Sequence, residues 1–320
     1  MKDIMYSKRY SEYFEYYKKG ILGKSRWARL RYSFALKLCG RYFTYKYPVL
    51  ASKQKVFGLN TTEKRDEKII VSLTSFPKRI NKVWICISTI LRQSVKPDVV
   101  ELWLSKEQFP NEEKDLPENL LELKEQGLSI FFCEDDLRSH KKYFYSMQKH
   151  PNDIVITCDD DFFYPSDMIF SLYEEYKKTG SIVGTANTFI GKENFYSPIQ
   201  WKMCTSETQN ADNLGLYSGS ATLFPPHTIS GYGFDLSIIK KTCPYADDLW
   251  LTAMTYLNGK KVSSLGRLPF PLPVKGTQEE ALTKTNNSES SAVNNDTQWK
   301  TILDYFSEEL KEWKESLLNG

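Results

Sequence analysis

The chain of 320 residues is long enough for one large domain or two small ones with an ample core. Its 41% apolar and 26% charged residues are ordinary for a globular protein, and no apolar run approaches the roughly 18 residues of a membrane-spanning helix. The first residues lack the apolar stretch of a secretory signal, and the six cysteines show neither a CxxC pair nor zinc-ligand spacing. We therefore expect a cytoplasmic protein with reduced cysteines rather than an exported or membrane-spanning one.

Positive charge is concentrated at the N-terminus. Residues 1–55 hold fourteen Lys or Arg and three acidic residues, a net charge of +11, which leaves −8 on the remainder. We expect this basic arm to form two helices broken near residues 20–23, and the second mixes Trp27 and Phe34 with Arg31. Basic residues among large apolar ones suit a helix that lies on an anionic membrane surface. Docking on the acidic body is the alternative; no nucleic-acid module is recognisable, so no nucleic-acid partner is expected.

Residues 56–67 are polar and predict a linker, after which strand and helix patterns alternate. Short, β-branched apolar runs predict buried strands at residues 68–74, 99–104, 128–133 and 154–158. The segments that follow these strands predict helices at residues 80–93, 116–126, 141–149 and 168–178. The alternation predicts an α/β body over residues 68–276, with a mixed, mostly parallel sheet flanked by helices. No GxGxxG or GxxxxGK(S/T) motif is present, so neither a dinucleotide-binding fold nor a P-loop is supported.

The pattern is looser in the second half of the chain. We expect a strand at residues 182–188 and a helix at residues 245–257. Residues 277–295 are polar and rich in Asn and Ser, which predicts a mobile loop. Residues 296–320 predict one amphipathic C-terminal helix, because Trp299, Phe306 and other apolar residues recur on one face.

Three consecutive carboxylates follow the strand expected at residues 154–158, namely Asp159, Asp160 and Asp161. Such carboxylates repel one another in a dry site, and a divalent cation such as Mn²⁺ or Mg²⁺ makes their grouping favourable. In open α/β sheets, ligands bind at the carboxyl ends of the strands, where these residues lie. Turns and helix caps also use Asp, but Ser166 and Asp167 already supply the turn before the next helix. We therefore expect a metal site and, with it, a phosphate-bearing ligand.

A second acidic pair, Asp247 and Asp248, lies near the start of the helix expected at residues 245–257. A sugar hydroxyl that attacks an anomeric carbon needs a general base close by, and a carboxylate serves this purpose. The same pair is equally typical of the acidic first turn of a helix. From the residues alone, both interpretations stay open.

The chain resembles bacterial family 2-like glycosyltransferases of the GT-A fold in the order of six segments: SLTSFPKRI (72–80), LRQSVKPDVVELWLSKEQFP (91–110), FCEDDLRSHKK (132–142), DIVITCDDDFFYP (153–165), SGSATLFPPH (218–227) and ADDLWL (246–251). Those enzymes build capsular or other surface polysaccharides. The resemblance covers roughly residues 68–265 and depends on the combination of segments, since a DXD motif alone is weak.

The resemblance implies metal-dependent, inverting transfer of a sugar from a nucleotide-diphosphate sugar, with a UDP-sugar favoured, to a saccharide or lipid-linked saccharide. It implies that Asp159 and Asp161 bind the metal, with His227 completing the metal shell. It implies that Asp248 is the general base and that Asp247 is the acidic residue that precedes the base in the family's motif. The residues that it implies for nucleotide-sugar binding are Thr74, Ser75, Pro77, Arg79, Asp135, Arg138, Lys142, Asp159 and Asp160.

Two features depart from the family pattern. The acidic residues usual near the first strand are replaced by the residues from Thr74 to Pro77, and the Arg that often follows the base motif is absent. A non-catalytic nucleotide-sugar or partner-binding protein on the same fold is the alternative. A haloacid-type phosphatase also has Asp-x-Asp after a strand, but its motif has Thr or Val at the position where this chain has Phe163.

From the basic arm we expect a peripheral enzyme on the inner face of the plasma membrane.

Overall fold

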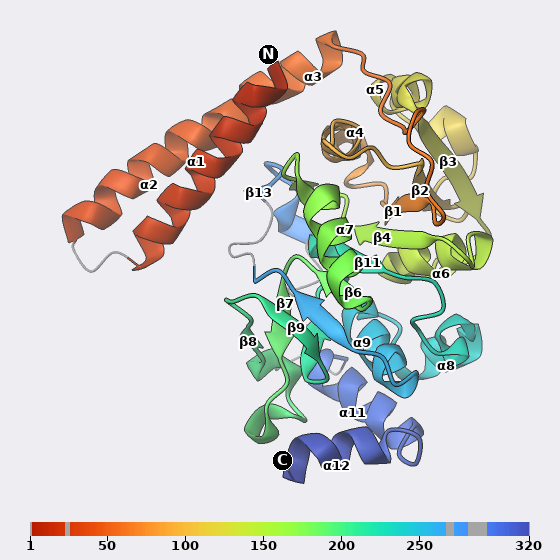
Figure 1. Ribbon diagram of the computed structural model, residues 1–320. Helices are drawn as coiled ribbons and strands as arrows, with labels where there is room; N and C mark the ends of the chain where they lie inside the picture. Colours follow the sequence, from red (N-terminus) through yellow and green to blue (C-terminus); the bar gives the residue numbers. More distant parts are fainter. Residues whose placement is uncertain (1, 23–25, 267–271, 281–292, 320) are drawn as a thin grey trace.

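The computed structural model describes residues 2–22, 26–266, 272–280 and 293–319. Figure 1 shows a pair of long N-terminal helices that projects from one side of an α/β body. Within the described residues, the main sheet has eight strands in the order β3-β2-β1-β4-β11-β6-β12-β9. Their bounds are β1 Ile69–Thr74, β2 Val99–Ser105, β3 Leu128–Cys133, β4 Ile154–Cys158, β6 Ile182–Gly184, β9 Thr208–Ala211, β11 Thr222–Phe224 and β12 Val262–Ser264.

The sheet is mixed and mostly parallel. β1 pairs in parallel with both β2 and β4, β2 pairs in parallel with β3, and β12 pairs in parallel with β6. β11 is antiparallel to both β4 and β6, and β9 is antiparallel to β12. The predicted mixed, mostly parallel sheet flanked by helices is therefore confirmed.

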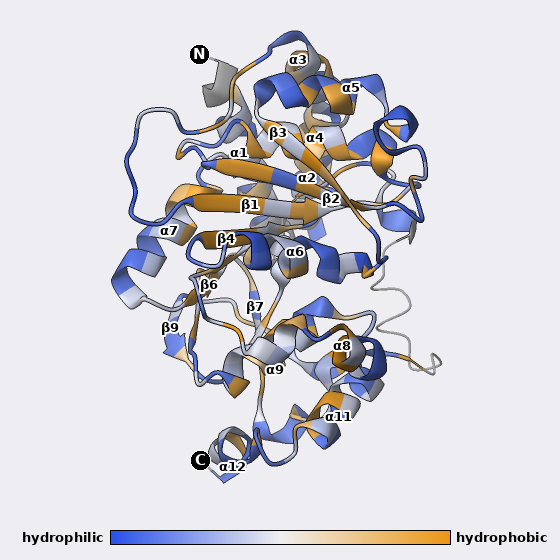
Figure 2. Ribbon diagram, turned by 90° about the vertical axis from the view of Figure 1, so that its right-hand side faces the viewer, coloured by the Kyte–Doolittle hydropathy of each residue, from blue (hydrophilic) through white to orange (hydrophobic). Residues whose placement is uncertain are grey.

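Helices cover both faces of this sheet. The described α-helices of the body are α4 Ile80–Ile90, α5 Glu118–Leu121, α6 Lys141–Lys149, α7 Met168–Thr179, α8 Leu236–Thr242, α9 Asp247–Leu257, α11 Asn295–Tyr305 and α12 Lys311–Asn319. α4, α5 and α7 form one core with the strand face that carries Val100 and Leu102. The intervening Glu101 points to the other face, where Ser146 of α6 donates a hydrogen bond to it at 2.9 Å. β1 and β4 are consequently apolar along most of their length (Figure 2).

Two small sheets extend the body beside the main one. They consist of β10 Leu214–Leu216 with β7 Asn187–Phe189 and β8 Lys202–Met203, and of β5 Phe162–Phe163 with β13 Leu272–Pro273. The strand predicted at residues 182–188 is thus divided between β6 and β7, which belong to different sheets.

The C-terminus forms two helices, α11 and α12, where one was predicted. The chain turns between them at residues 306–310, and both Phe306 and Leu310 are buried in the core that contains Trp250 and Trp299. Trp299, Phe306 and Leu310 are buried in the same core, so the chain keeps its predicted apolar face across the turn between the two helices.

Residues 54–67, which include the predicted linker, contain neither helix nor strand and are bonded to the body. The Gly58 amide donates to the Gln126 carbonyl at 2.8 Å, and the side chains of Asn60 and Arg65 both donate to Asp98. These hydrogen bonds fix the segment to the body at Gly58, Asn60 and Arg65.

The N-terminal arm comprises α1 Lys2–Leu22, α2 Arg26–Arg41, a π-helical turn Tyr42–Lys46 and α3 Tyr47–Lys53. The two predicted helices are present as α1 and α2, and the structure places them side by side and antiparallel (Figure 1). None of the described helices is both long enough and apolar enough to span a membrane.

The root of the arm is buried against the body. Tyr6, Phe43 and Tyr47 form an apolar cluster with Phe163 of β5 and Leu272 of β13. The Tyr6 hydroxyl also donates to the Tyr164 carbonyl at 2.6 Å. These contacts fix the arm to the segment that directly follows the three consecutive carboxylates.

We predict that Phe43→Ala lowers the free energy of unfolding by about 3 kcal/mol, because the fully buried ring leaves a cavity between arm and body. Urea unfolding of the full chain measures the change. Phe34→Ala on the same arm is the control, since that ring is exposed and its loss should change stability by less than about 0.5 kcal/mol. Equal effects of the two substitutions would contradict a docked root.

Candidate active site

A cavity of about 530 Å³ opens at the carboxyl ends of β1 and β4. Seven acidic and four basic side chains line it, so it carries excess negative charge when all are ionised. The predicted site residues among its lining are Thr74, Ser75, Arg79, Arg138, Lys142, Asp159, Asp160, Asp161, Asp247 and Asp248. The parallel pairing of β1 with β4 brings the segment after Thr74 beside the three carboxylates.

The three carboxylates differ in what they contact. Asp160 accepts a hydrogen bond from the Ser75 hydroxyl and one from Arg79 at 2.7 Å. Burial raises the pKa of Asp160, although Arg79 and Ser75 oppose this effect. The Asp160 carboxylate therefore holds in place the loop after β1, which carries Ser75 and Arg79.

Asp161 has a buried oxygen without a partner. Its Oδ2 accepts from Gln278 at 2.7 Å and lies 3.0 Å from the Arg79 guanidinium. Its Oδ1 contacts no hydrogen-bond donor among the described residues, although the residue is only 4% exposed. Burial, followed by the charges of Asp159 and Asp160, raises the pKa of Asp161 to about 8. A buried carboxylate oxygen left unsatisfied is costly, and a bound cation would satisfy it.

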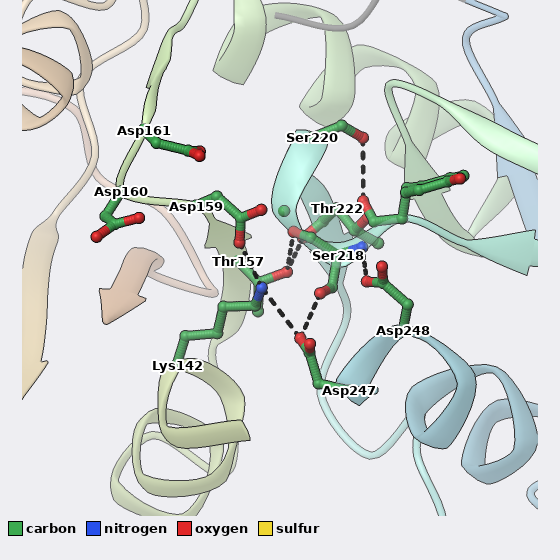
Figure 3. Close-up of polar contacts among 12 residues, drawn as sticks. Lys142, Thr157, Asp159, Asp160, Asp161, Ser218, Ser220, Thr222, Asp247 and Asp248 are labelled. Carbon is green, nitrogen blue, oxygen red and sulfur yellow. Dashed lines mark hydrogen bonds and ion pairs between the residues drawn. The ribbon is translucent and has the colours of Figure 1, made fainter. Parts of the chain in front are cut away.

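The residues fit a divalent metal bound by two carboxylates. Asp159 is partly exposed, and in Figure 3 the carboxylates of Asp159 and Asp161 lie on the same side of their segment. No three Asp, Glu, His or Cys side chains come together as a complete metal site within the described part of the chain. Mg²⁺ is commonly held by one or two carboxylates together with water and substrate phosphates. Asp159 and the unpartnered oxygen of Asp161 match that kind of open site.

Lys142 joins the two acidic clusters. Its Nζ lies 2.7 Å from Asp159 and 3.0 Å from Asp247, and its side chain is 2% exposed (Figure 3). Burial alone would lower the pKa of the Lys142 ammonium, but the two carboxylates outweigh burial and raise it. Lys142 is therefore a permanent positive charge inside the cavity.

The turn Ser218–Ser220 provides a second link between the clusters. The Ser218 amide donates to Asp248 at 2.6 Å, and the Ser218 hydroxyl donates to Asp247 at 2.6 Å (Figure 3). The next carbonyl, that of Gly219, accepts from the Asp159 amide at 3.1 Å and from the Tyr164 hydroxyl at 2.6 Å. One short turn thus positions residues of both clusters.

Asp247 and Asp248 have opposite environments although they are neighbours in the sequence. Burial would raise the pKa of Asp247, but Lys142, His140 and Ser218 outweigh it and lower the pKa to about 2. Burial and the adjacent charge of Asp247 raise the pKa of Asp248 to about 7. Paired carboxylates whose pKa values are pushed apart are suited to different roles. Asp247 stays an anion, whereas Asp248 can accept a proton near neutral pH.

His227 lies far from the acidic cluster, and its expected place in the metal shell is corrected. It follows β11, whose last residue Phe224 pairs with Val155 near the start of β4. Its ring contacts Asn152 at 3.2 Å. The carboxylates Asp159 and Asp161 follow the other end of β4, so His227 cannot share a metal with them.

Two further predicted residues lie outside the cavity lining. Asp135 pairs with Lys240 at 3.1 Å, and Pro77 is exposed in the turn before α4. Asp136, one residue beyond Asp135, does line the cavity, where it pairs with Lys141. The sequence shows an acidic group at residues 134–136 without indicating which member faces inward.

The remaining predicted binding residues lie at the wall of the cavity. The Thr74 hydroxyl donates to the Trp103 carbonyl at 2.7 Å, and the Arg138 guanidinium lies 4.6 Å from the centre of the Tyr245 ring. Sequence reasoning missed Ser218, Gly219 and Gln278. Gln278 belongs to the polar segment predicted as a mobile loop, yet it contacts Asp161; residues 281–292 of that segment lie outside the described residues.

Comparison with known proteins gives no family. No protein-family model and no curated protein matches the chain. Among solved structures, the chain is similar to the mannosyltransferase PcManGT from Pyrobaculum calidifontis in complex with GDP-Man and Mn²⁺. The TM-score is 0.40 at 13% identity, and the similarity covers 75% of this chain and 66% of PcManGT. TarS 1–349 from S. aureus, in complex with UDP-GlcNAc, is similar with a TM-score of 0.39 and 10% identity. This similarity covers 78% of the present chain and 74% of TarS 1–349.

GalNAc-T7 with UDP, GalNAc and Mn²⁺ gives a TM-score of 0.46 and 10% identity, over 87% of this chain and 57% of that one. The chain thus spans less than two thirds of the length of PcManGT and of GalNAc-T7. At this identity, no residue role transfers from these proteins to the present chain.

We predict that Gly219→Ala lowers the free energy of unfolding by about 2 kcal/mol through overpacking. A Cβ at this position would lie 1.8 Å from Oδ2 of Asp159, which Lys142 holds in place. Urea unfolding measures the loss. Gly231→Ala is the matched control, because a Cβ there meets nothing within 4 Å. An unchanged midpoint for Gly219→Ala would show that Asp159 moves aside freely.

Proposed function

We propose that the protein is a metal-dependent glycosyltransferase that moves a sugar from a nucleotide-diphosphate sugar to a hydroxyl of a saccharide or lipid-linked saccharide. One observation carries this proposal. A single cavity contains a buried carboxylate oxygen without a partner, on Asp161, and a carboxylate whose pKa is raised to about 7, on Asp248. The first suits a cation with a diphosphate, and the second suits the proton of an attacking hydroxyl.

The diphosphate would lie at the Asp159–Asp161 end of the cavity. Asp159 and Asp161 would hold Mn²⁺ or Mg²⁺, which when bound neutralises the charge that develops on a diphosphate leaving group. Arg79 is already fixed there by its ion pairs with Asp160 and Asp161, so its charge is preorganised. Lys142 and Arg138, whose guanidinium lies over the Tyr245 ring, would provide further positive charge for binding the phosphates. A UDP-sugar is the donor that we expect.

The acceptor would lie at the Asp248 end. Pro198, Trp201 and Leu216, from the segments after β7 and around β10, line that cavity together with Asp248. The acceptor oxygen forms the new bond to the anomeric carbon while the bond to the diphosphate breaks, and Asp248 takes the hydroxyl proton. Asp247 cannot take this role, because its pairing with Lys142 keeps its pKa low. A single displacement of this kind inverts the anomeric configuration.

The proposed cellular setting is surface-polysaccharide synthesis at the inner face of the plasma membrane. The basic arm supports this setting, because it combines positive charge with exposed apolar side chains such as Trp27 and Phe34. The arm projects from the side of the body toward which β4 runs (Figure 1). A nucleotide-sugar-binding protein without catalysis is the alternative. It predicts donor binding that does not depend on Asp248 and no transfer at all.

We predict that one nucleotide diphosphate or nucleotide sugar raises the melting temperature in the presence of Mn²⁺ and fails to do so with a chelator. A ligand at 100-fold above its dissociation constant adds about 2.7 kcal/mol, which a thermal scan detects readily. Asp161→Asn should remove the metal-dependent shift, whereas Asp304→Asn, on the exposed face of α11, should retain it. A shift that survives in Asp161→Asn, or no shift with any nucleotide, would contradict the proposed donor site.

We predict that the transfer rate rises with pH and levels off above about pH 7. Asp248 acts as a base only when ionised, and its raised pKa of about 7 places that ionisation within the assay range. Asp248→Asn should bind the donor normally and lose about 10²- to 10⁴-fold in transfer rate, with the rise near pH 7 abolished. Steady-state transfer assays across pH, with donor binding measured in parallel, provide the check. Normal transfer by Asp248→Asn would assign the base elsewhere.

A further inference from the structure

The second helix of the arm exposes a continuous apolar stripe. Trp27 is 82% exposed and Phe34 is 66% exposed, and Leu30 and Leu38 are exposed with them. Their spacing of three and four residues places all four on one face of α2, over about 17 Å of helix. α1 covers another side of α2, where Cys39 is buried and the rings of Tyr16 and Tyr32 stack. Exposed apolar stripes of this size usually contact a partner.

Basic side chains flank the stripe without acidic partners on the same helix. α2 contains no acidic residue, and the exposed basic residues whose side chains are described on it are Arg26, Arg31, Lys37 and Arg41. On α1, Glu12 pairs with Arg9 and Glu15 pairs with Lys19. The face that carries the stripe is therefore both apolar and positively charged.

We propose that α2 docks flat on an anionic lipid bilayer, with Trp27, Leu30, Phe34 and Leu38 inserted at the boundary between headgroups and acyl chains. A helix with an apolar face bordered by Lys and Arg suits this position, because the side chains gain both apolar burial and attraction to anionic lipid. A second copy of the chain fits less well. Pairing stripe against stripe would bring Arg31, Lys37 and Arg41 of both copies together.

The arm connects this lipid contact to the cavity. Tyr10 and Tyr6 donate to the carbonyls of Phe163 and Tyr164, in the segment that follows the three carboxylates. Val274 belongs to the apolar cluster at the root of the arm, and its amide donates to the Asp161 carbonyl at 2.7 Å. Since β4 runs toward the side from which the arm projects (Figure 1), docking of α2 would place the carboxyl end of β4 on the membrane-bound side of the body. If the proposed glycosyl transfer holds, this orientation favours a lipid-linked acceptor.

Flotation of the full-length protein with vesicles tests the proposal without any donor, metal or acceptor. We expect binding to vesicles of phosphatidylcholine with phosphatidylglycerol and weak binding to phosphatidylcholine alone. Trp27→Ser with Phe34→Ser should weaken binding by roughly tenfold for each ring removed. Arg31→Gln with Lys37→Gln should weaken it by about fivefold for each charge, and added salt should weaken the wild type. Phe170→Ser on α7 removes an exposed ring outside the arm and should leave binding unchanged.

Two outcomes would overturn the proposal. Equal flotation of the wild type and the Trp27→Ser, Phe34→Ser variant, or no flotation of either, would show that the stripe does not contact lipid. A dimer of the wild type in lipid-free solution that this variant abolishes would assign the stripe to a second copy. The variants replace exposed side chains, so unchanged thermal unfolding confirms that they fold. Because the assay uses no nucleotide sugar, its failure leaves the proposed glycosyl transfer to its own test.

Discussion

The buried ammonium of Lys142 contacts Asp159 at 2.7 Å and Asp247 at 3.0 Å, and the geometry of the whole cavity depends on this contact. A charge that is withdrawn from water is tolerated only where opposite charges and hydrogen bonds compensate it. The buried ammonium of Lys142 therefore needs both carboxylates in place. The same charge that holds the clusters together separates their chemistry, because it keeps Asp247 ionised while Asp248, beside it, has a raised pKa.

The antiparallel strand β11 makes this contact possible. It lies between β4 and β6 and runs opposite to β4, with Thr222 paired to Thr157. The turn Ser218–Ser220 before β11 consequently lies against the end of β4, where Asp159 begins. The residues after β11, including His227, are carried by the same geometry to the start of β4. One strand direction thus explains both why Ser218 and Gly219 belong to the site and why His227 does not.

The cavity is also connected to the surface of the molecule through β5 and β13. β5 directly follows Asp161, and the Val274 amide after β13 donates to the Asp161 carbonyl. Phe163 of β5 and Leu272 of β13 also pack against the root of the arm. The arm is therefore part of the packing around the site rather than an appendage joined by a loose linker. Its root is apolar and buried, whereas α2 keeps large apolar side chains exposed. Two different apolar surfaces on one hairpin are consistent with one surface for the body and another for a lipid bilayer.

The sequence by itself determined the local features of this protein. Apolar, β-branched runs predicted β1 to β4, because a strand buried on both faces needs such side chains along its whole length. The position of Asp159, Asp160 and Asp161 directly after β4 placed them at the carboxyl edge of the sheet, where open α/β sheets generally bind ligands. The acidic pair at the start of α9 was visible too, although its pattern fitted a helix terminus equally well.

Only the tertiary structure decided which of these groups meet and what each contacts. Lys142 and Asp247 come together because α6 and α9 share one apolar core, and no local pattern encodes that distance. Whether Asp135 or Asp136 faces the cavity depends on the turn of a loop, and Gln278 reaches Asp161 from a segment that composition marked as a mobile loop. The pKa values of Asp247 and Asp248 likewise follow from burial and neighbouring charges. Such effects act through space, so the order of residues along the chain does not determine them.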